Sequence, residues 1–317
     1  MNLLASLRYL AALDEHKHFG RAALACHITQ PALSNALRAL EAEFGCAIVI
    51  RGRSFGGFTS EGERVLLSGQ RMLHERQLLQ QDLSSVAGRP QGSLLIGSVP
   101  TAVPIAARFA ATLQARHPGI APVVRSMSSA ELENGLESLS LDMGLGYTDR
   151  LARYSPRLRH IAQYAEQYFL VRKASEQPSN AMKIGNGMTW AEAALLPLCL
   201  LSREMHNRSL MEAVFFQMGA VVKPAIQTNS ILTLILSVSA GDVCSIVPSA
   251  LVGTMRGYHE LEALPLLDPD VRTPVGFMVQ GGDRTSRALD AAMQLAQDAE
   301  WMQSIASCGG LPDRCPD

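Results

Sequence analysis

The sequence predicts an α + α/β protein, with a small N-terminal helical domain, one long helix and a large α/β domain. Apolar residues recur with helical spacing as far as residue 45, and again without interruption over residues 59–88. From residue 93 onward, short apolar runs alternate with helical segments, a pattern typical of α/β domains. The chain has 317 residues, which is enough for several domains with separate cores.

The N-terminal domain begins with two helical segments. The first places four leucines on one face, and the second is expected at about residues 20–26, where small alanines allow close helix contact. The leucines are Leu3, Leu7, Leu10 and Leu13. The "HIT" turn then leads into a third segment.

The third segment has clear start and stop signals. Thr29 is expected to cap its N-terminus, Pro31 lies in the first turn where a missing N–H is harmless, and Gly45 ends it. Its buried face is predicted to consist of Leu33, Leu37 and Leu40. The domain therefore contains two short helices joined by a turn to a third that carries one apolar face.

The opposite face of the third helix is polar in its N-terminal half. Gln30, Ser34, Asn35 and Arg38 project from it. Short hydrogen-bonding groups and a guanidinium are suited to contacts with base edges in the DNA major groove. A helix-turn-helix protein presents this part of its recognition helix to DNA, although a small helical bundle with an exposed polar face would give the same pattern.

The next segment favours DNA binding over a plain bundle. "AIVIRGRSFGGFT" predicts a β-hairpin wing whose basic tip carries Arg51 and Arg53, both suited to phosphate contacts. The charge of the domain adds little, because residues 1–58 contain six basic and four acidic side chains and the whole chain has a net charge of −1. The DNA-binding prediction therefore depends on geometry.

These residues resemble the LysR-type transcriptional regulators, through "FGRAALACHITQPALSNALRALEAEFG" and "RGRSFGGFTSEGERVL", and weakly over nearly the whole chain. The resemblance implies a winged helix-turn-helix that binds double-stranded promoter DNA. Positions facing DNA would be Gln30, Pro31, Ser34 and Arg38, with backbone contacts from Arg21, Thr29, Arg51 and Arg53. Asn35-Ala36 departs from the basic or polar pair of many members, which leaves base preference open. Val49-Ile50 replaces the usual leucine–phenylalanine and changes core packing.

Residues 59–88 predict one long helix. Thr59 or Ser60 can cap it, and Ser60 with Glu63 fits a capping box. A seam of apolar residues recurs every seven positions at Val65, Met72, Leu79 and Val86, flanked by Leu66, Leu73 and Leu83. This seam suits pairing with a second copy, and about 28 residues would span roughly 40 Å. We expect a dimer, and a tetramer by resemblance.

The C-terminal part predicts an α/β domain with largely parallel sheets. The expected strands are "LLIGSV", "APVVRSM", "DMGLGY", "YFLVRK", "LPLCLLS", "VCSIVPSAL" and "VGFMVQ". Polar helix starts follow three of them: Thr101 with Pro104 early in the helix, Ser128 with Glu131 as a capping box, and Asn229 or Ser230. Such helix starts at the ends of strands are potential anion sites, although most are simple caps.

The resemblance implies that this part is a two-lobed, periplasmic-binding-protein-like effector domain with a small-molecule site between its lobes. The pocket positions carried over are Pro100, Thr101, Ser128, Ser129, Tyr147, Met205 and Asn229. A narrower resemblance, through "TWAEAALLPLCLLSREMHNRSLM", is to the subgroup encoded beside formate dehydrogenase genes. It implies formate or another small carboxylate as effector and no cofactor.

The expected boundaries follow from these segments. Residues 1–58 form the winged helix-turn-helix, 59–88 the linker and dimerisation helix, 89–92 a hinge, 93–305 the effector-binding domain and 306–317 a tail. Lobe I is expected at about 93–165 and 268–305, and lobe II at about 166–267. RNA polymerase is a further partner that the resemblance makes possible.

Three other functions are less consistent with the sequence. No H-E-x-x-H, P-loop or G-x-G-x-x-G motif supports an enzyme, and of the eight dispersed histidines only His206, beside Asn207, is a candidate ligand contact. A thiol-based redox regulator of the same fold would need paired cysteines, of which only Cys308 and Cys315 are close in sequence. A periplasmic binding protein would need a signal peptide, and without one or a membrane span we expect a cytoplasmic protein.

Overall fold

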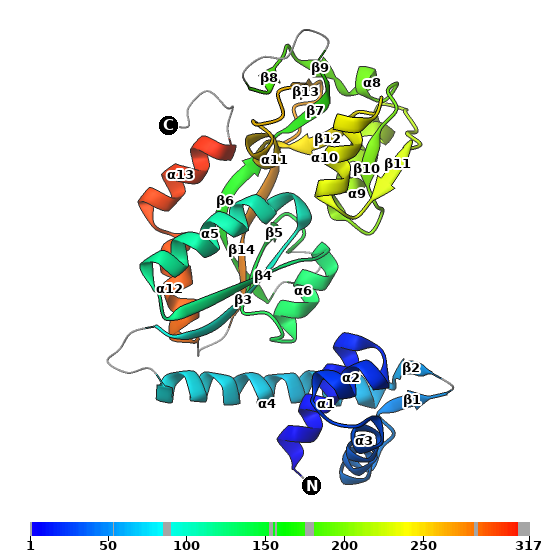
Figure 1. Cartoon of the computed structure of the whole chain (residues 1–317), viewed down its shortest axis with the longest axis vertical. Helices are drawn as coiled ribbons and strands as arrows, with labels where there is room; N and C mark the ends of the chain where they lie inside the picture. The colour runs from blue at the N-terminus through cyan, green and yellow to red at the C-terminus, as the bar shows by residue number, and fades with distance from the viewer. Residues whose placement is uncertain are drawn as a thin grey trace. The chain divides into compact units, whose positions relative to one another are not determined.

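The structure is a computed structural model, and it describes residues 2–52, 54–84, 90–151, 155, 157–174, 181–281 and 285–309. The chain forms two compact units, one from the N-terminus through the long helix and one from β3 to the last helix. Each is considered by itself (Figure 1). Among the described residues, no helix combines the length and apolar character that crossing a membrane requires.

The first unit is a three-helix domain with a two-stranded wing and a long helix. Its elements are α1 (Leu3–His16), α2 (Phe19–Ala25), α3 (Gln30–Phe44), β1 (Val49–Arg51), β2 (Phe55–Phe58) and α4 (Ser60–Ser84). Strands β1 and β2 pair antiparallel as the predicted hairpin. The core contains the predicted leucines, except that Leu3, at the start of α1, is 36% exposed.

Helix α3 begins and ends as the sequence predicts. The Thr29 hydroxyl accepts a hydrogen bond from the Ala32 amide at 3.3 Å, and a proline occupies the first turn. Gly45 ends the helix with φ of 65°, a left-handed conformation that glycine adopts without a side-chain clash. Leu33, Leu37 and Leu40 are fully buried.

The start of α4 corrects the predicted Ser60–Glu63 capping box. Thr59, one of the two predicted caps, caps the helix by accepting from the Gly62 amide at 2.9 Å, while its hydroxyl donates to the Ala47 carbonyl at 2.6 Å. The Ser60 hydroxyl bonds the neighbouring Glu61. A Cβ at Gly62 would lie 2.1 Å from the Ile48 carbonyl oxygen, so the helix start packs directly against the strand that enters the wing.

The second unit has two lobes. Lobe I contains the sheet β4-β3-β5-β14-β6, and lobe II contains the sheet β12-β7-β13-β8, with β9 paired to β13, and the separate pair β10-β11. Lobe I comprises β3 (Gly92–Ser98), η2 (Pro100–Ala102), α5 (Val103–Arg116), β4 (Ile120–Ser126), α6 (Ser129–Glu137), β5 (Met143–Tyr147), β6 (Leu158–Glu166), β14 (Thr273–Gln280), α12 (Arg287–Ala296) and α13 (Ala299–Gly309). Lobe II comprises β7 (Tyr168–Lys173), β8 (Lys183–Ile184), β9 (Met188–Thr189), α8 (Trp190–Ala193), β10 (Cys199–Leu201), α9 (His206–Gln217), β11 (Ile226–Thr228), α10 (Ile231–Ala240), β12 (Ser245–Pro248) and β13 (Leu261–Leu267).

The sheets are mixed, so the prediction of largely parallel sheets is wrong. β3 lies parallel to β4 and β5, which are reached through helical connections. β14, by contrast, pairs antiparallel with both β5 and β6, and β7 pairs antiparallel with β12 and β13. The cause is the crossing between lobes, because β6 leaves lobe I and β14 returns to it, so the two run in opposite directions (Figure 1).

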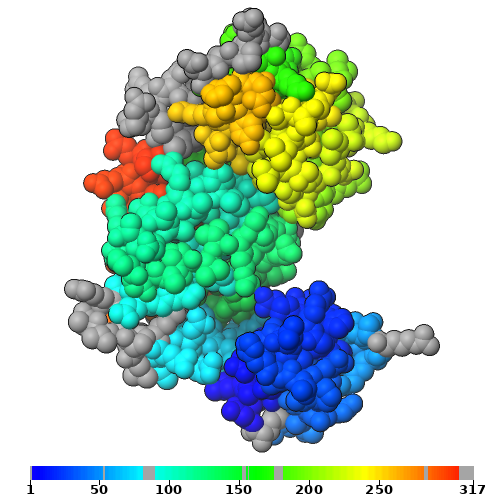
Figure 2. All heavy atoms as spheres, in the orientation of Figure 1, coloured from blue at the N-terminus to red at the C-terminus, as the bar shows by residue number. Residues whose placement is uncertain are grey.

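A short helix belongs to both lobes. In α11 (Ser249–Thr254), Ala250 packs into the lobe I core while Leu251 and Val252 pack into a lobe II core. The same helix contacts α5 and α13 in lobe I and β12 in lobe II. The surfaces of the two lobes meet in Figure 2, where the teal of lobe I adjoins the yellow of lobe II.

Candidate functional site

The first candidate site is the polar face of α3. Gln30, Pro31, Asn35 and Arg38 are exposed, and Ser34 is half-buried. The Asn35 side-chain oxygen accepts from an Arg38 guanidinium nitrogen at 3.3 Å, so these two side chains are held together on the surface. The face predicted to read DNA is therefore open to solvent, with its leucines turned into the core.

Two predicted backbone contacts flank this face. Arg21 is exposed on α2, and Thr29 is exposed at the start of α3, where its hydroxyl already serves as the cap. The start of α2 is capped by His18, whose Nδ1 accepts from the amides of Gly20 and Arg21 at 3.1 and 3.3 Å. No role for His18 could be predicted from the sequence.

Arg51 does not project freely from the wing tip. Its guanidinium bonds the Glu41 carboxylate of α3 at 2.8 Å, and the same carboxylate accepts from the amides of Ile48 and Val49 at 3.0 and 3.1 Å. Burial by itself would raise the Glu41 pKa, but these hydrogen bonds outweigh it and the pKa is lowered. Arg51 therefore joins the wing to α3, and Arg53 lies outside the described residues.

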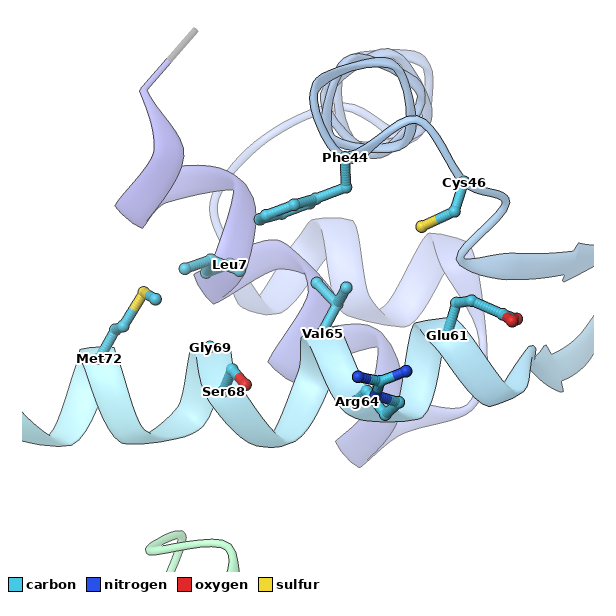
Figure 3. A pocket seen from close by; sticks show the side chains of 9 residues that line it. All are labelled: Leu7, Phe44, Cys46, Glu61, Arg64, Val65, Ser68, Gly69 and Met72. Carbon is cyan, nitrogen blue, oxygen red and sulfur yellow. The ribbon is translucent and has the colours of Figure 1, made fainter.

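An open groove lies between α1, the end of α3 and α4 (Figure 3). It is lined by Leu7, Phe44, Cys46, Glu61, Arg64, Val65, Ser68, Gly69 and Met72. Phe44 is 44% exposed and Met72 47%, and Leu79, the next residue of the predicted seam, is 49% exposed. Val86 and the side chain of Leu83 lie outside the part of the chain that the structure describes.

The second candidate site is a small cavity between the lobes. Five predicted pocket residues line it: Pro100, Thr101, Ser129, Tyr147 and Met205. The remaining lining residues are Val99, Leu201, His206 and Asn207. The free volume of the cavity is about 10 Å³, roughly the room that one water molecule needs. The cavity is therefore far smaller than the pockets that bind drug-sized ligands.

Two predicted pocket residues do not line this cavity. The Ser128 hydroxyl is used in the capping box of α6, donating to the Glu131 carboxylate at 2.8 Å and accepting from its amide at 3.3 Å. Asn229 is exposed to solvent, and its neighbour Ser230 is the residue that caps α10, accepting from the Thr233 amide at 3.2 Å. Both were carried over from the family resemblance, which does not specify where the side chain points.

Several polar groups converge on the cavity without partners. The Ser129 hydroxyl is buried and makes no hydrogen bond, and no side chain caps the first turn of α9, which begins at His206. His206 Nδ1 lies 3.0 Å from an Arg150 nitrogen, while its Nε2 makes no hydrogen bond but lies 3.7 Å from the Asp149 carboxylate. Arg150 also bonds the Glu133 carboxylate at 2.7 Å. Free donors and a helix N-terminus suit a small anion.

A buried carboxyl lies behind the cavity wall. Glu166, at the end of β6, is 0% exposed, and the Tyr147 hydroxyl donates to its Oε2 at 3.2 Å. Burial raises the pKa of Glu166 to about 8, although the hydrogen bond from Tyr147 acts to lower it. The sequence analysis missed Glu166, because an isolated glutamate in a polar strand gives no signal of burial.

The cysteines that the structure describes are not arranged as a pair. Cys199 and Cys244 lie on adjacent backbone segments, with the Cys199 amide donating to the Cys244 carbonyl at 2.8 Å. Their side chains nevertheless pack into two different core clusters, and burial raises the pKa of both thiols. The close pair in the sequence, Cys308 and Cys315, lies outside the side chains that the structure describes.

Comparisons with known proteins bear on both sites. Residues 4–63 match the bacterial regulatory helix-turn-helix protein family of the lysR type, and residues 87–301 match the LysR substrate binding domain. The DNA-binding transcriptional dual regulator OxyR of Escherichia coli strain K12 is 26% identical over 288 residues, covering 88% of this chain and 90% of that protein. The SDS degradation transcriptional activation protein of a Pseudomonas species is 36% identical over 121 residues, covering 38% of this chain and 40% of that protein.

Solved structures share the fold at lower identity. A variant of full-length OxyR from Pseudomonas aeruginosa has a TM-score of 0.65 at 21% identity, covering 91% of this chain and 95% of that one. Full-length CbnR in complex with its target DNA has a TM-score of 0.62 at 19% identity, covering 92% and 97%. The named relatives do not support the narrower resemblance to regulators encoded beside formate dehydrogenase genes.

Proposed function

Because the chain belongs to the LysR family of DNA-binding transcriptional regulators, we propose that it controls its promoters in response to a small anion bound between the lobes of its effector domain. Members of this family are regulators and not enzymes. Formate or another small carboxylate is the effector class we favour. The observation that carries this choice is the small cavity with an unpartnered, buried Ser129 hydroxyl beside the uncapped start of α9.

For DNA recognition we propose that Gln30, Ser34, Asn35 and Arg38 contact base edges, while Pro31 packs against the DNA surface. Support comes from the exposure of this face on a helix whose other face is buried. Arg21, Thr29 and Arg53 are assigned to the phosphate backbone, and Arg51 to the joint between wing and helix. Arg38→Ala should cost about 1–3 kcal/mol of specific affinity, measured by fluorescence anisotropy on the chain's own promoter against scrambled DNA.

We propose that the protein acts as a dimer, assembling further to a tetramer, and in the cytoplasm where its DNA lies. The exposed Phe44, Met72 and Leu79 support a second copy seated on the groove and on the seam of α4, since apolar residues at helical spacing favour helix pairing. RNA polymerase is the further partner expected at an activated promoter.

The effector changes DNA binding only if it binds two assembly states with different affinity. Thermal unfolding of the full-length chain tests the effector class, with formate, acetate, sulfate and benzoate as probes at constant ionic strength. A rise in melting temperature that follows a binding isotherm for the small carboxylates, and is lost in Ser129→Ala, is expected. If no anion gave a saturable shift, the proposed effector class would be wrong.

A thiol-based redox sensor is the second candidate, favoured by the similarity to OxyR and to proteins named hydrogen peroxide-inducible genes activators. The separate burial of Cys199 and Cys244 weighs against it, since two cysteines must meet to form a disulfide. Mass spectrometry of the full-length chain after mild peroxide treatment separates the candidates. A stoichiometric intramolecular disulfide coupled to a change in promoter affinity would favour the redox sensor.

A further inference from the structure

We infer that Glu166 is a positioning residue of the effector cavity. Through Tyr147 it sets the direction of a series of hydrogen bonds that ends on Thr101. Binding of an anion in the cavity is therefore coupled to protonation of the Glu166 carboxyl. This inference rests on the proposed function of the same cavity. Glu166 does not line the cavity, so it acts on the ligand only through its neighbours.

The chain of contacts is continuous. The Tyr147 hydroxyl lies 3.2 Å from Glu166 Oε2 and 2.8 Å from Thr101 Oγ1, and the Asn207 side-chain amide donates to it at 3.4 Å. Tyr147, Thr101 and Asn207 all line the cavity. All four residues are buried, with Glu166 0%, Thr101 1%, Tyr147 2% and Asn207 4% exposed. Water therefore does not replace these partners.

The number of hydroxyl hydrogens determines which residue donates in each of these hydrogen bonds. An ionised carboxylate only accepts, so Tyr147 must donate its single hydroxyl hydrogen to Glu166. The hydrogen between Tyr147 and Thr101 then comes from Thr101, which leaves only lone pairs of Thr101 for the cavity. A protonated Glu166 donates to Tyr147 instead, Tyr147 donates to Thr101, and the Thr101 hydrogen is free to point into the cavity. An anion accepts this hydrogen but is repelled by lone pairs.

The surroundings of Glu166 favour its neutral form. The titratable groups acting on it are the phenols of Tyr147, Tyr164 and Tyr168, from β5, β6 and β7, and across from them β14 supplies Thr273, whose hydroxyl bonds Tyr168 at 3.1 Å. Glu166 Oε1 and the Tyr164 hydroxyl are buried without a well-formed hydrogen bond.

The charged groups Arg150 and Asp149 contact His206 at the cavity, and the His206 ring packs edge-on against Tyr147 at 5.1 Å. None of these contacts reaches the Glu166 carboxyl. When Glu166 is ionised beforehand, binding of an anion therefore takes up one proton from solvent onto this carboxyl, and no covalent bond changes.

The test is calorimetric titration of the full-length chain with sodium formate and sodium acetate at pH 6.5 and pH 9, at constant ionic strength. Neither anion titrates in this range. Because burial holds the pKa of Glu166 at about 8, the wild-type affinity is expected to fall about tenfold between these pH values. Glu166→Gln supplies a permanent donor to Tyr147, so it should keep the affinity measured at pH 6.5 and change less than twofold with pH.

Two further variants separate this role from a merely structural one. Thr101→Val should lose anion affinity at both pH values, and His206→Gln should keep the tenfold pH dependence. If Glu166→Gln retained the wild-type pH dependence while binding anions, or if His206→Gln abolished it, the positioning role of Glu166 would be refuted and the anion effector would stand. If no variant and no wild-type sample bound either anion, both the effector class and this inference would fall.

Discussion

The substitution Glu166→Gln should change how the stability of the effector domain depends on pH. In the unfolded chain a glutamate titrates near 4.5, whereas burial raises the folded-state pKa of Glu166 to about 8. A raised folded pKa contributes stability that is fully present below the unfolded pKa and is lost as pH rises through the folded one. The free energy of unfolding falls by about 1.4 kcal/mol per pH unit, or on the order of 5 kcal/mol between the unfolded pKa near 4.5 and the folded pKa of about 8.

The assay is urea unfolding of the full-length chain at pH 5.5 and pH 7.5, followed by tryptophan fluorescence. Both tryptophans, Trp190 and Trp301, lie in the effector domain, so the signal reports on that unit. Over these two pH units Glu166 should make the wild type less stable at the higher pH by about 3 kcal/mol, and Glu166→Gln should remove that difference.

The control is Tyr147→Phe, which deletes the hydrogen bond to Glu166 but keeps the carboxyl. Its overall stability should be lower, while the decline with pH should persist. If the free energy of unfolding changed equally with pH in the wild type and in Glu166→Gln, the reasoning would be refuted. The carboxyl would then ionise as readily in the folded state as in the unfolded chain.

Three further outcomes follow from the N-terminal domain. Glu41→Gln should lower the thermal stability of this domain by about 1–3 kcal/mol, measured by circular dichroism of the helices, because the Ile48 and Val49 amides and Arg51 lose an ionised acceptor. Since the folded pKa of Glu41 is lowered, its contribution is present above the unfolded pKa and lost as pH falls, so wild type and variant should converge in acid. Leu33→Ala should cost about 2–5 kcal/mol in the same measurement. Met72→Glu should lower the mass measured by light scattering toward the monomer, and an unchanged mass would exclude the groove as an interface between copies.

The N-terminal helices could be predicted from the sequence because their signals are local. A cap, a proline and a glycine define α3 within seventeen residues, Thr29 through Gly45, and its leucines repeat with the helical period. The sheet arrangement could not be predicted in the same way. Strand β6 carries polar side chains and no simple alternation, and its pairing partner β14 lies over a hundred residues later.

The effector cavity was predictable only in part. Five residues carried over from the family resemblance line the cavity: Pro100, Thr101, Ser129, Tyr147 and Met205. Ser128 and Asn229 do not, because the Ser128 hydroxyl bonds Glu131 and Asn229 is exposed to solvent. The link from Tyr147 to Glu166 had no sequence signal. It depends on the chain crossing between lobes, which brings the ends of β5 and β6 to opposite sides of β14.

Helix α11 packs into the cores of both lobes, and this limits how the lobes can move relative to each other. A helix whose Ala250 packs into one core and whose Leu251 and Val252 pack into the other joins the two lobes where it lies. Close-packed contacts tolerate small sliding but not separation. We therefore expect effector binding to act by shear, as a short displacement of α11 carried to α13, which it contacts. A regulator built in this way would signal its ligand through a small shift in packing, with its overall outline nearly unchanged.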